Sequence, residues 1–272
     1  MSPHWRNRLS RAGRVLVASD FDGTLAQIVP EPDEAAPLPG AVELLAQLAR
    51  RGDFRVAIVS GRALSDLRRR CDVPGCWYVG GHGNETAEPD HRDDLAPETT
   101  SPGHHIELRQ QIASIADDLR RKLHSWPGAR MEAKPYSVAV HFRQAPQWET
   151  AIRDTFSAFT SRGEFRVMLG RQVIELLPDN ALTKGHAVQR LRSRLDCDLV
   201  FYFGDDVTDE DVFRLNDAHF IGVKVKHGEG AIATAAAYAL SGPPAVLMAL
   251  REIARVRPLP EKKSLRFSAV QP

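Results

Sequence analysis

Acidic and hydroxyl side chains follow three short apolar runs of the sequence, at the point where each run ends. The runs and the polar residues behind them are 15–18 with Asp20 and Asp22, 56–59 with Ser60, and 199–203 with Asp205 and Asp206. Short apolar runs are typical of strands buried in a parallel sheet, and the carboxyl ends of such strands meet at one edge, where ligands bind. We therefore expect the four carboxylates to share a cleft. Their mutual repulsion there is tolerable if their oxygens bind a divalent cation such as Mg²⁺.

An alternative explains part of this acidic set without a cation. Residues 205–211 are rich in Asp and Glu, and acidic side chains in the first turn of a helix are stabilised by the helix dipole. We favour that explanation for Glu210 and Asp211. We do not favour it for Asp20 and Asp205, because each closely follows an apolar run.

The elements that must position these groups alternate along the chain. The runs that predict buried strands are residues 15–18, 56–59, 77–79, 199–203 and 220–223. Apolar residues at helical spacing predict helices at 39–50 and 64–70, between the first three strands. Strands that alternate with helices indicate right-handed crossovers, so we predict an α/β fold with a doubly wound, mostly parallel, Rossmann-like core sheet.

The middle of the chain has a different pattern. Helices predicted at 106–124 and 148–160 are each followed by two short strands joined by a hairpin-length turn. This helix-strand-strand unit, used twice, predicts an α+β cap domain at 102–179. The cap is inserted into a catalytic core made of residues 14–101 and 180–256. We expect residues 1–13 to be a flexible leader and residues 257–272 a flexible tail.

The composition argues against several classes of protein. The chain has 272 residues with 36 basic and 35 acidic side chains, and its net charge of +1 gives no field that would favour nucleic acid or an anionic membrane. No stretch approaches the roughly 18 apolar residues that a membrane span needs. Three cysteines are too few for a disulfide framework, so we expect a reduced, cytoplasmic setting. We expect a monomer that binds neither nucleic acid nor membrane; the arginine-rich leader leaves an RNA- or lipid-binding arm as the alternative.

Four motifs, in order along the chain, resemble those of haloacid dehalogenase-type phosphatases. They are Asp20-Phe21-Asp22-Gly23-Thr24, Ser60, Lys184 and Gly204-Asp205-Asp206. Further segments narrow the resemblance to trehalose-6-phosphate phosphatases. They are Ser60-Gly61-Arg62, Gly81-His82-Gly83-Asn84-Glu85, Glu132-Ala133-Lys134, His141-Phe142-Arg143, Glu175, Thr183-Lys184-Gly185 and residues 204–211. One departure is Leu25-Ala26-Gln27-Ile28, where that family commonly has Leu-x-Pro-Ile; we expect it to matter little.

The resemblance implies a role for each polar group of the core. Asp20 would be the nucleophile that forms an aspartyl-phosphate, and a carboxylate needs no deprotonation for this at neutral pH. Asp22 would protonate the leaving oxygen and then activate water. Ser60 and Lys184 would hold phosphoryl oxygens in the transition state. The implied Mg²⁺ ligands are Asp20, Asp205, the backbone carbonyl of Asp22 and, as secondary candidates, Asp206 and Asp209.

The inserted module suggests which kind of substrate is selected. Alternation along its strands puts apolar residues on one face and, on the other, groups of both signs, which are Glu132, Lys134, His141, Arg143 and Glu175. Such a face suits a ligand with many hydroxyls, which needs donors and acceptors. A solvated face with cross-strand ion pairs is the alternative. With the resemblance, the expected contacts to substrate are Glu132, Lys134, Arg143 and Glu175 from the cap, and Arg62, Gly83, Asn84 and Glu85 from the core. His82 is expected to be structural.

Together these features lead to one functional hypothesis with two alternatives. The resemblance implies a Mg²⁺-dependent phosphatase that converts trehalose 6-phosphate to trehalose and phosphate, with a cap that closes over the substrate and excludes water. The alternatives are a phosphatase for another sugar phosphate (of sucrose, mannosylglycerate or a hexose) and a non-catalytic sugar-phosphate sensor. Intact Asp20, Asp22, Lys184 and Asp205 disfavour the sensor, because a sensor does not need the second aspartate.

Overall fold

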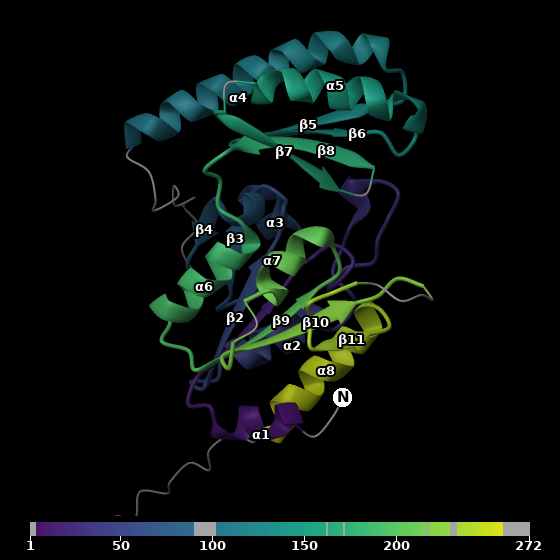
Figure 1. The fold of residues 1–272 in the computed structure, drawn as a ribbon. Helices are drawn as coiled ribbons and strands as arrows, with labels where there is room; N and C mark the ends of the chain where they lie inside the picture. Colours follow the sequence, from purple (N-terminus) through teal and green to yellow (C-terminus); the bar gives the residue numbers. More distant parts are fainter. Residues whose placement is uncertain are drawn as a thin grey trace, which may run out of the picture.

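Two β-sheets organise the molecule, a larger one in the core and a smaller one that lies over the end of the core with two helices on its outer side (Figure 1). The structure is a computed structural model that describes residues 4–89, 102–161, 163–170, 172–215, 217–228 and 233–257. No helix within these residues is long and apolar enough to cross a membrane.

The larger sheet has seven strands in the order β11-β10-β9-β1-β2-β3-β4. Their bounds are β1 Val15–Ser19, β2 Phe54–Val59, β3 Trp77–Gly80, β4 Glu85–Ala87, β9 Leu199–Gly204, β10 Phe220–Val225 and β11 Tyr238–Leu240. All neighbouring strands are parallel except β3 and β4, which are antiparallel. The prediction of a mostly parallel core sheet is therefore confirmed.

Helices cover both faces of this sheet. Alternation along β1 sends Val15 and Val17 to one apolar cluster and Leu16 and Ala18 to the other. The first cluster includes side chains of α1 (His4–Arg11), α2 (Ala41–Ala49), α3 (Leu64–Arg70) and α8 (Pro243–Val256), and the second those of α6 (Lys184–Arg194) and α7 (Glu210–Phe213). Burial on both faces explains why the strands are continuous apolar runs.

The expectation of a flexible leader is wrong for His4–Arg11, which form the helix α1. Trp5 and Leu9, four residues apart on one helix face, are fully buried. The Trp5 ring lies edge-on against Phe201 of the central sheet, with ring centroids 5.9 Å apart. Arg8 donates hydrogen bonds to two backbone carbonyls, those of Ala218 and Phe220. At the other terminus, residues 258–272 lie outside the described part of the chain.

The smaller sheet has four antiparallel strands in the order β5-β6-β8-β7. They are β5 Arg130–Lys134, β6 Ser137–His141, β7 Phe165–Gly170 and β8 Val173–Pro178, and the helices packed on one face are α4 (Pro102–Lys122) and α5 (Glu149–Thr160). Residues of this face, such as Val138 and Leu176, pair across the strands. The separate α+β cap sheet is confirmed, whereas the division of the chain into domains at 102 and 180 stays a prediction.

Short 3-10 turns join several of these elements. They are Pro32–Glu34, Gly81–Gly83, Leu123–Ser125, Pro146–Trp148 and Val207–Asp209. Gly81–Gly83 directly follows β3, and Val207–Asp209 lies three residues after the end of β9, so both turns lie at the carboxyl edge of the core sheet. This is the edge at which an open α/β sheet binds its ligands.

Candidate active site

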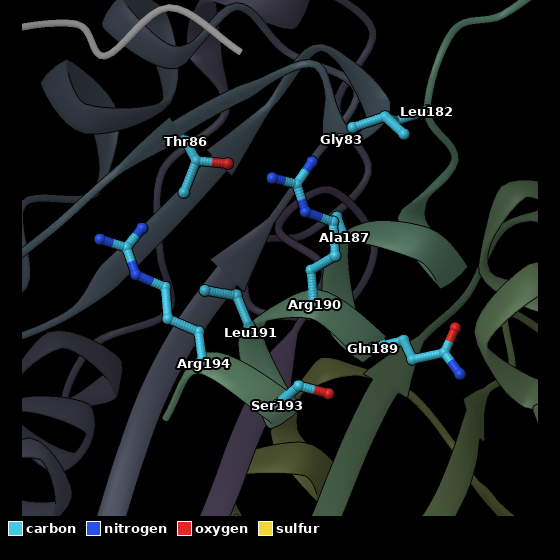
Figure 2. A pocket seen from close by; sticks show the side chains of 9 residues that line it. All are labelled: Gly83, Thr86, Leu182, Ala187, Gln189, Arg190, Leu191, Ser193 and Arg194. Atoms are coloured by element: carbon cyan, nitrogen blue, oxygen red, sulfur yellow. The ribbon is translucent and has the colours of Figure 1, made fainter. Parts of the chain in front are cut away.

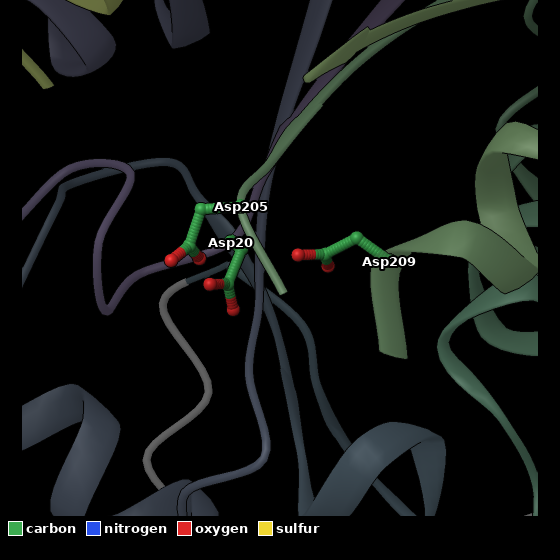
Figure 3. A group of neighbouring side chains, drawn as sticks. All are labelled: Asp20, Asp205 and Asp209. Atoms are coloured by element: carbon green, nitrogen blue, oxygen red, sulfur yellow. The ribbon is translucent and has the colours of Figure 1, made fainter. Parts of the chain in front are cut away.

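Three carboxylates gather at the carboxyl edge of the core sheet (Figure 3). Asp20, Asp205 and Asp209 each offer an oxygen, and these oxygens lie within 4.8 Å of one another. The pairing of β1 with β9 brings the first two together, because Ser19 is in register with Phe203. The backbone N–H of Asp20 also donates to the carbonyl of Phe203, at 2.8 Å. The expected crowding of acids at adjacent strand ends is therefore present.

Burial controls the electrostatics of this group. Asp20 is only 4% exposed, and burial raises its pKa well above the ordinary value, with Asp209 and Asp205 adding repulsion and Lys184 opposing the shift. Burial also raises the pKa of Asp205, and a hydrogen bond from His227 works against it. Carboxylates that are this close together and this shielded from water need further positive charge nearby to stay ionised.

One oxygen of this group also lacks a partner. Asp205 Oδ1 is buried and accepts no hydrogen bond from the described residues, while Oδ2 lies 3.0 Å from His227 Nε2. Buried acceptor atoms almost always receive a hydrogen bond, so a buried oxygen without one indicates a missing partner. A hard cation bound between Asp20 and Asp205 would satisfy it, and an all-oxygen donor set fits Mg²⁺.

Lys184 connects the nucleophile candidate to the third acid. Its Nζ lies 2.8 Å from Asp20 Oδ1 and 2.8 Å from Asp209 Oδ1, and its side chain is 3% exposed. Burial disfavours the charge of Lys184, but the two carboxylates outweigh it and raise its pKa above the ordinary value, so the amine stays protonated. Thr183 caps the helix that begins at Lys184, in a capping box with His186. This cap fixes the backbone position from which the Lys184 side chain extends.

Asp209 has a fuller set of partners than the sequence suggested. In addition to Lys184, it accepts hydrogen bonds from Tyr202 Oη at 2.6 Å and from the backbone N–H of Asp206 at 2.9 Å. The carboxylates of Asp206 and Asp22 lie outside the three-carboxylate group, and Asp22 was expected to bind the ion through its backbone carbonyl. Of the two secondary candidates, Asp209 belongs to the group and Asp206 does not.

Asp22 is held by an arginine on the next strand end. The guanidinium of Arg62 donates to both carboxylate oxygens of Asp22, at 2.7 Å each, and also to Asp66 at 2.8 Å. Such a two-pronged pair fixes orientation as well as charge. Ser60 is buried, and its Oγ accepts from the backbone N–H of Arg62 at 3.2 Å, so its own proton can be donated to a ligand.

On the cap, a buried carboxylate faces the core. Glu175 Oε1 accepts from Ser137 Oγ at 2.5 Å and Lys134 Nζ at 3.0 Å, and Oε2 lies 3.2 Å from His82 Nε2 of the core. Burial works to raise the pKa of Glu175, yet Lys134 and His82 together bring it well below the ordinary value. Glu132 lies beside this set, 4.0 Å from Lys134 and 3.1 Å from His141.

The other predicted contact residues divide between exposed and occupied positions. Arg143 is exposed, with Nη1 3.5 Å from the carbonyl of Val29 in the core. The amide of Asn84 instead bonds backbone groups of Gly81 and Leu182. Glu85 is buried and accepts from the backbone N–H of Leu64 at 3.4 Å. The structure therefore brings Glu132, Lys134 and Glu175 together and gives Asn84 and Glu85 backbone partners. The substrate roles of all of them stay predictions.

Several residues near the acids were not found from the sequence. His227 contacts Asp205 and lies just beyond β10. Its position behind an apolar strand is the sequence feature that could have identified it as a site residue. Lys224 donates to the carbonyl of Asp206 at 3.1 Å and to Glu210 at 3.4 Å. Glu210 is thereby a buried, bonded residue as well as a helix N-terminal acid. Tyr202 lies inside an apolar run and gave no signal.

The shape of the surface alone does not locate this chemistry. A pocket of about 410 Å³ lies beside α6, away from the acids, and Figure 2 shows the guanidinium groups of Arg190 and Arg194 beside it. Gly83 is the member of its lining that was also predicted as a site residue. We place the candidate site at the acids, because a cluster of buried charges at the sheet edge is tied to chemistry, and a hollow in the surface is not by itself.

Comparisons with known proteins concern the fold and the family of the chain. The trehalose-6-phosphate phosphatase C-terminal domain of Candida albicans superposes with a TM-score of 0.75 at 23% identity, covering 94% of this chain and 98% of that one, which shows a shared fold. The trehalose-phosphate phosphatase of Mycobacterium marinum is 40% identical over 240 residues, covering 85% of this chain and 59% of the relative. That of Mycobacterium bovis is 38% identical over 246 residues, covering 87% and 60%.

The chain thus spans about three fifths of the length of these curated relatives. A sequence model of one family, described as trehalose-phosphatase, matches residues 18–244, which include the acids, Lys184 and the whole cap sheet. On this match, and with the relatives above, the chain belongs to the trehalose-phosphatase family.

Proposed function

We propose that this protein hydrolyses trehalose 6-phosphate to trehalose and phosphate in a Mg²⁺-dependent reaction. The observation that carries the proposal is the buried contact of Asp20 with Lys184 beside Asp205, in a chain that belongs to the trehalose-phosphatase family. A buried, oriented carboxylate next to a fixed ammonium suits attack on a phosphate monoester, where catalysis depends on positioning and charge stabilisation.

The residues present fit a magnesium ion. Asp20 would hold it together with Oδ1 of Asp205, which has no hydrogen-bond partner among the described residues, and the backbone carbonyl of Asp22 is the further ligand that the resemblance implies. When bound, the ion would supply positive charge to the acids and to the phosphate oxygens. Asp209 is the weaker candidate ligand, because both its oxygens already accept hydrogen bonds and it fixes Lys184.

The side chains of the core would divide the reaction between them. Asp20 would attack phosphorus through a carboxylate oxygen and form an aspartyl-phosphate. Asp22 would give a proton to the departing sugar oxygen, and would then take one from the water that hydrolyses the intermediate. Lys184 and the hydroxyl of Ser60 would hold phosphoryl oxygens as negative charge shifts toward them. Arg62 orients the carboxylate of Asp22 through both of its oxygens, and one of these contacts would give way when Asp22 carries the proton that it donates.

The cap would select the sugar. Glu132, Lys134 and Glu175 share the polar face of the cap sheet, as their register pairs show, and they combine donors with acceptors. A disaccharide presents many hydroxyls that need both. Arg143, exposed and near the carbonyl of Val29, is the fourth cap contact that we propose.

A panel of phosphate esters tests the proposal. We expect phosphate release from trehalose 6-phosphate to exceed that from sucrose 6-phosphate, mannosylglycerate phosphate and glucose 6-phosphate, each compared by kcat/KM. A higher value for any other sugar phosphate would move the assignment to that substrate. Binding of trehalose 6-phosphate without phosphate release would instead identify a sensor.

Two properties of the whole protein also stay proposals. The cysteines Cys71, Cys76 and Cys197 are free and buried, which supports a reduced, cytoplasmic setting. The monomeric state is a prediction that light scattering on the purified protein checks.

A further inference from the structure

His82 has a backbone conformation that side chains with a Cβ rarely adopt. Its φ is 58°, in the left-handed region, inside the turn Gly81–Gly83. The turn is also tightly confined, since a Cβ at Gly83 would lie 2.7 Å from the carbonyl oxygen of Thr183. A strained non-glycine residue persists only where its surroundings hold it, and such residues cluster at functional sites.

The side chain of His82 reaches across to the cap. Nε2 lies 3.2 Å from Glu175 Oε2, and both side chains are buried. A carboxylate only accepts hydrogen bonds, so Nε2 carries the proton and donates it. Nδ1 is buried and has no partner among the described residues, so the Glu175 contact is the hydrogen bond that this ring makes there.

The ring also lies against the loop that carries Ser60 and Arg62. A Cβ placed on Gly61 would lie 2.4 Å from His82 Cε1, so the residue between Ser60 and Arg62 has no room for a side chain. The backbone continues this contact, because the His82 N–H donates to the carbonyl of Ser60 at 3.1 Å and the Gly81 N–H to that of Arg62 at 2.8 Å.

The same turn is bonded to the segment that leads into Lys184. Asn84 Nδ2 donates to the carbonyl of Gly81 at 2.6 Å, and Asn84 Oδ1 accepts from the backbone N–H of Leu182 at 3.0 Å. Leu182 precedes the capping residue of α6, whose first residue is Lys184. One short turn therefore touches the loops that position Ser60, Arg62 and Lys184.

At the other end of the contact, Glu175 belongs to the sugar-facing set of the cap. Its second oxygen is held by Lys134 and Ser137. One carboxylate is thus shared between the polar face of the cap sheet and the strained turn of the core. A movement of the cap away from the core would break the His82 contact and leave Glu175 without its core partner.

We propose that His82 is a positioning residue that couples the closed position of the cap to the phosphate-binding loops through Glu175. The expected effect on catalysis rests on the proposed function. The expected effect on the position of the cap rests only on the contacts between cap and core. Its role is to place Glu175, and with it Lys134, over the phosphate site. It makes no contact with the reacting atoms.

Two amide substitutions that differ in reach, to Asn and to Gln, test this coupling. Asn tolerates the left-handed backbone, but its amide is too short to reach Glu175, whereas Gln carries its amide nitrogen close to the place of Nε2. We expect His82→Asn to lower kcat/KM for trehalose 6-phosphate about tenfold, the loss typical of a hydrogen bond to a charged group. We expect His82→Gln to recover most of it. Release from p-nitrophenyl phosphate, which is too small to engage the cap, should change less than about twofold.

A double substitution separates positioning from general damage. If His82 acts through Glu175, adding His82→Asn to Glu175→Gln should lower kcat/KM for trehalose 6-phosphate by much less than it does in the wild-type background. Additive losses, or equal losses on both substrates from His82→Asn, would overturn the proposal.

The position of the cap is measured without substrate. Dyes on Ser157→Cys in α5 and Met248→Cys in α8, both exposed, report the distance from cap to core, while the native cysteines are buried. We expect His82→Asn to lower the energy-transfer efficiency and His82→Gln to keep the wild-type value. An unchanged efficiency in His82→Asn would contradict the coupling.

This measurement also separates the two proposals. If trehalose 6-phosphate is not a substrate, the proposed function fails while the energy-transfer result still decides the role of His82. Should His82→Asn not fold, Glu175→Ala removes the same contact from the cap side, and the energy transfer decides alone.

Discussion

The environment of Asp20 combines charges of both signs within hydrogen-bond distance. Lys184 Nζ lies 2.8 Å from one oxygen of Asp20, while the carboxylates of Asp205 and Asp209 lie nearby and repel its negative charge. Burial raises the pKa of Asp20, so an ionised nucleophile depends on positive charge that Lys184 supplies in part. A cation beside Asp205 would supply the rest.

Removing the charge of Asp20 tests its assignment as nucleophile. We expect Asp20→Asn to lower kcat by at least about a thousandfold, because an amide is a far poorer nucleophile toward phosphorus. Asp211→Asn is the matched control, since Asp211 is an aspartate of the acidic segment 205–211 and pairs only with the exposed Arg214 in the described structure. Phosphate release by both variants is the measurement. Comparable activity in wild type and Asp20→Asn would exclude the role.

The cap acids should affect selection of the sugar more than the chemistry. We expect Glu132→Ala to reduce kcat/KM for trehalose 6-phosphate about tenfold or more, and to reduce that for an aryl phosphate much less, because its lost partners are hydroxyls. Glu149→Ala, an exposed cap residue paired with Arg153, is the control. Equal losses on the two substrates would count against a role in selection.

At the scale of single residues, the sequence located most of the acids but did not show which of them contact Lys184. Asp20 and Asp205 end apolar strands, so their meeting follows from sheet topology alone. Which of Asp206 and Asp209 turns toward Lys184 depends on the 3-10 turn Val207–Asp209, whose geometry no periodicity encodes. The contact of His82 with Glu175 joins residues 93 apart, one in the turn after β3 of the core and the other on β8 of the cap, and no local pattern predicts such a pair.

Elements that are buried on both sides were predictable from the sequence, and short ones with few anchors were not. The strands β1, β2 and β9 each contain a continuous apolar run, so their place in the core was clear. Helix α1 consists mostly of polar residues and is anchored by the buried side chains of Trp5 and Leu9. In the sequence these two are isolated apolar residues within a basic segment, which gives no sign of a packed helix. Its stability comes from tertiary packing, which a single segment does not show.

Helix α1 should therefore contribute to the stability of the core. We expect Trp5→Ala to lower the free energy of unfolding by about 3–5 kcal/mol, as for other large buried aromatic residues. His4→Ala, at an exposed position next to it, should change the free energy by less than about 0.5 kcal/mol. Urea denaturation of the two variants provides the comparison. Equal stabilities would restore the description of this segment as a leader outside the core.

For the whole molecule, contacts between cap and core decide how the two sheets act together. Glu175 bonds with His82, Arg143 lies near the carbonyl of Val29, and Arg130 pairs with Glu31. The first of these is buried. The second is a long hydrogen bond from an exposed arginine, and the third is an ion pair near the surface, where such pairs stabilise little. The buried carboxylate is thus the contact whose loss should be felt most.

The pH dependence of stability follows from this carboxylate. Its pKa is depressed in the fold because Lys134 and His82 outweigh burial, and it rises to about 4.3 when the chain unfolds. The stabilisation is therefore complete above that value and is lost as the pH falls below it. We expect the free energy of unfolding to fall more steeply between about pH 5 and pH 3 in wild type than in Glu175→Gln. Glu149→Gln, exposed on α5, should keep the wild-type slope; equal slopes in all three proteins would contradict the shift.

The most direct test of the central claim is phosphate release from trehalose 6-phosphate with Mg²⁺, with EDTA, and with Mg²⁺ restored in excess over EDTA. If the acids around Asp20 hold the ion that the reaction needs, release should stop in EDTA and return when Mg²⁺ is restored. Undiminished release in EDTA would contradict the account, as would a failure to release phosphate from this substrate when Mg²⁺ is present.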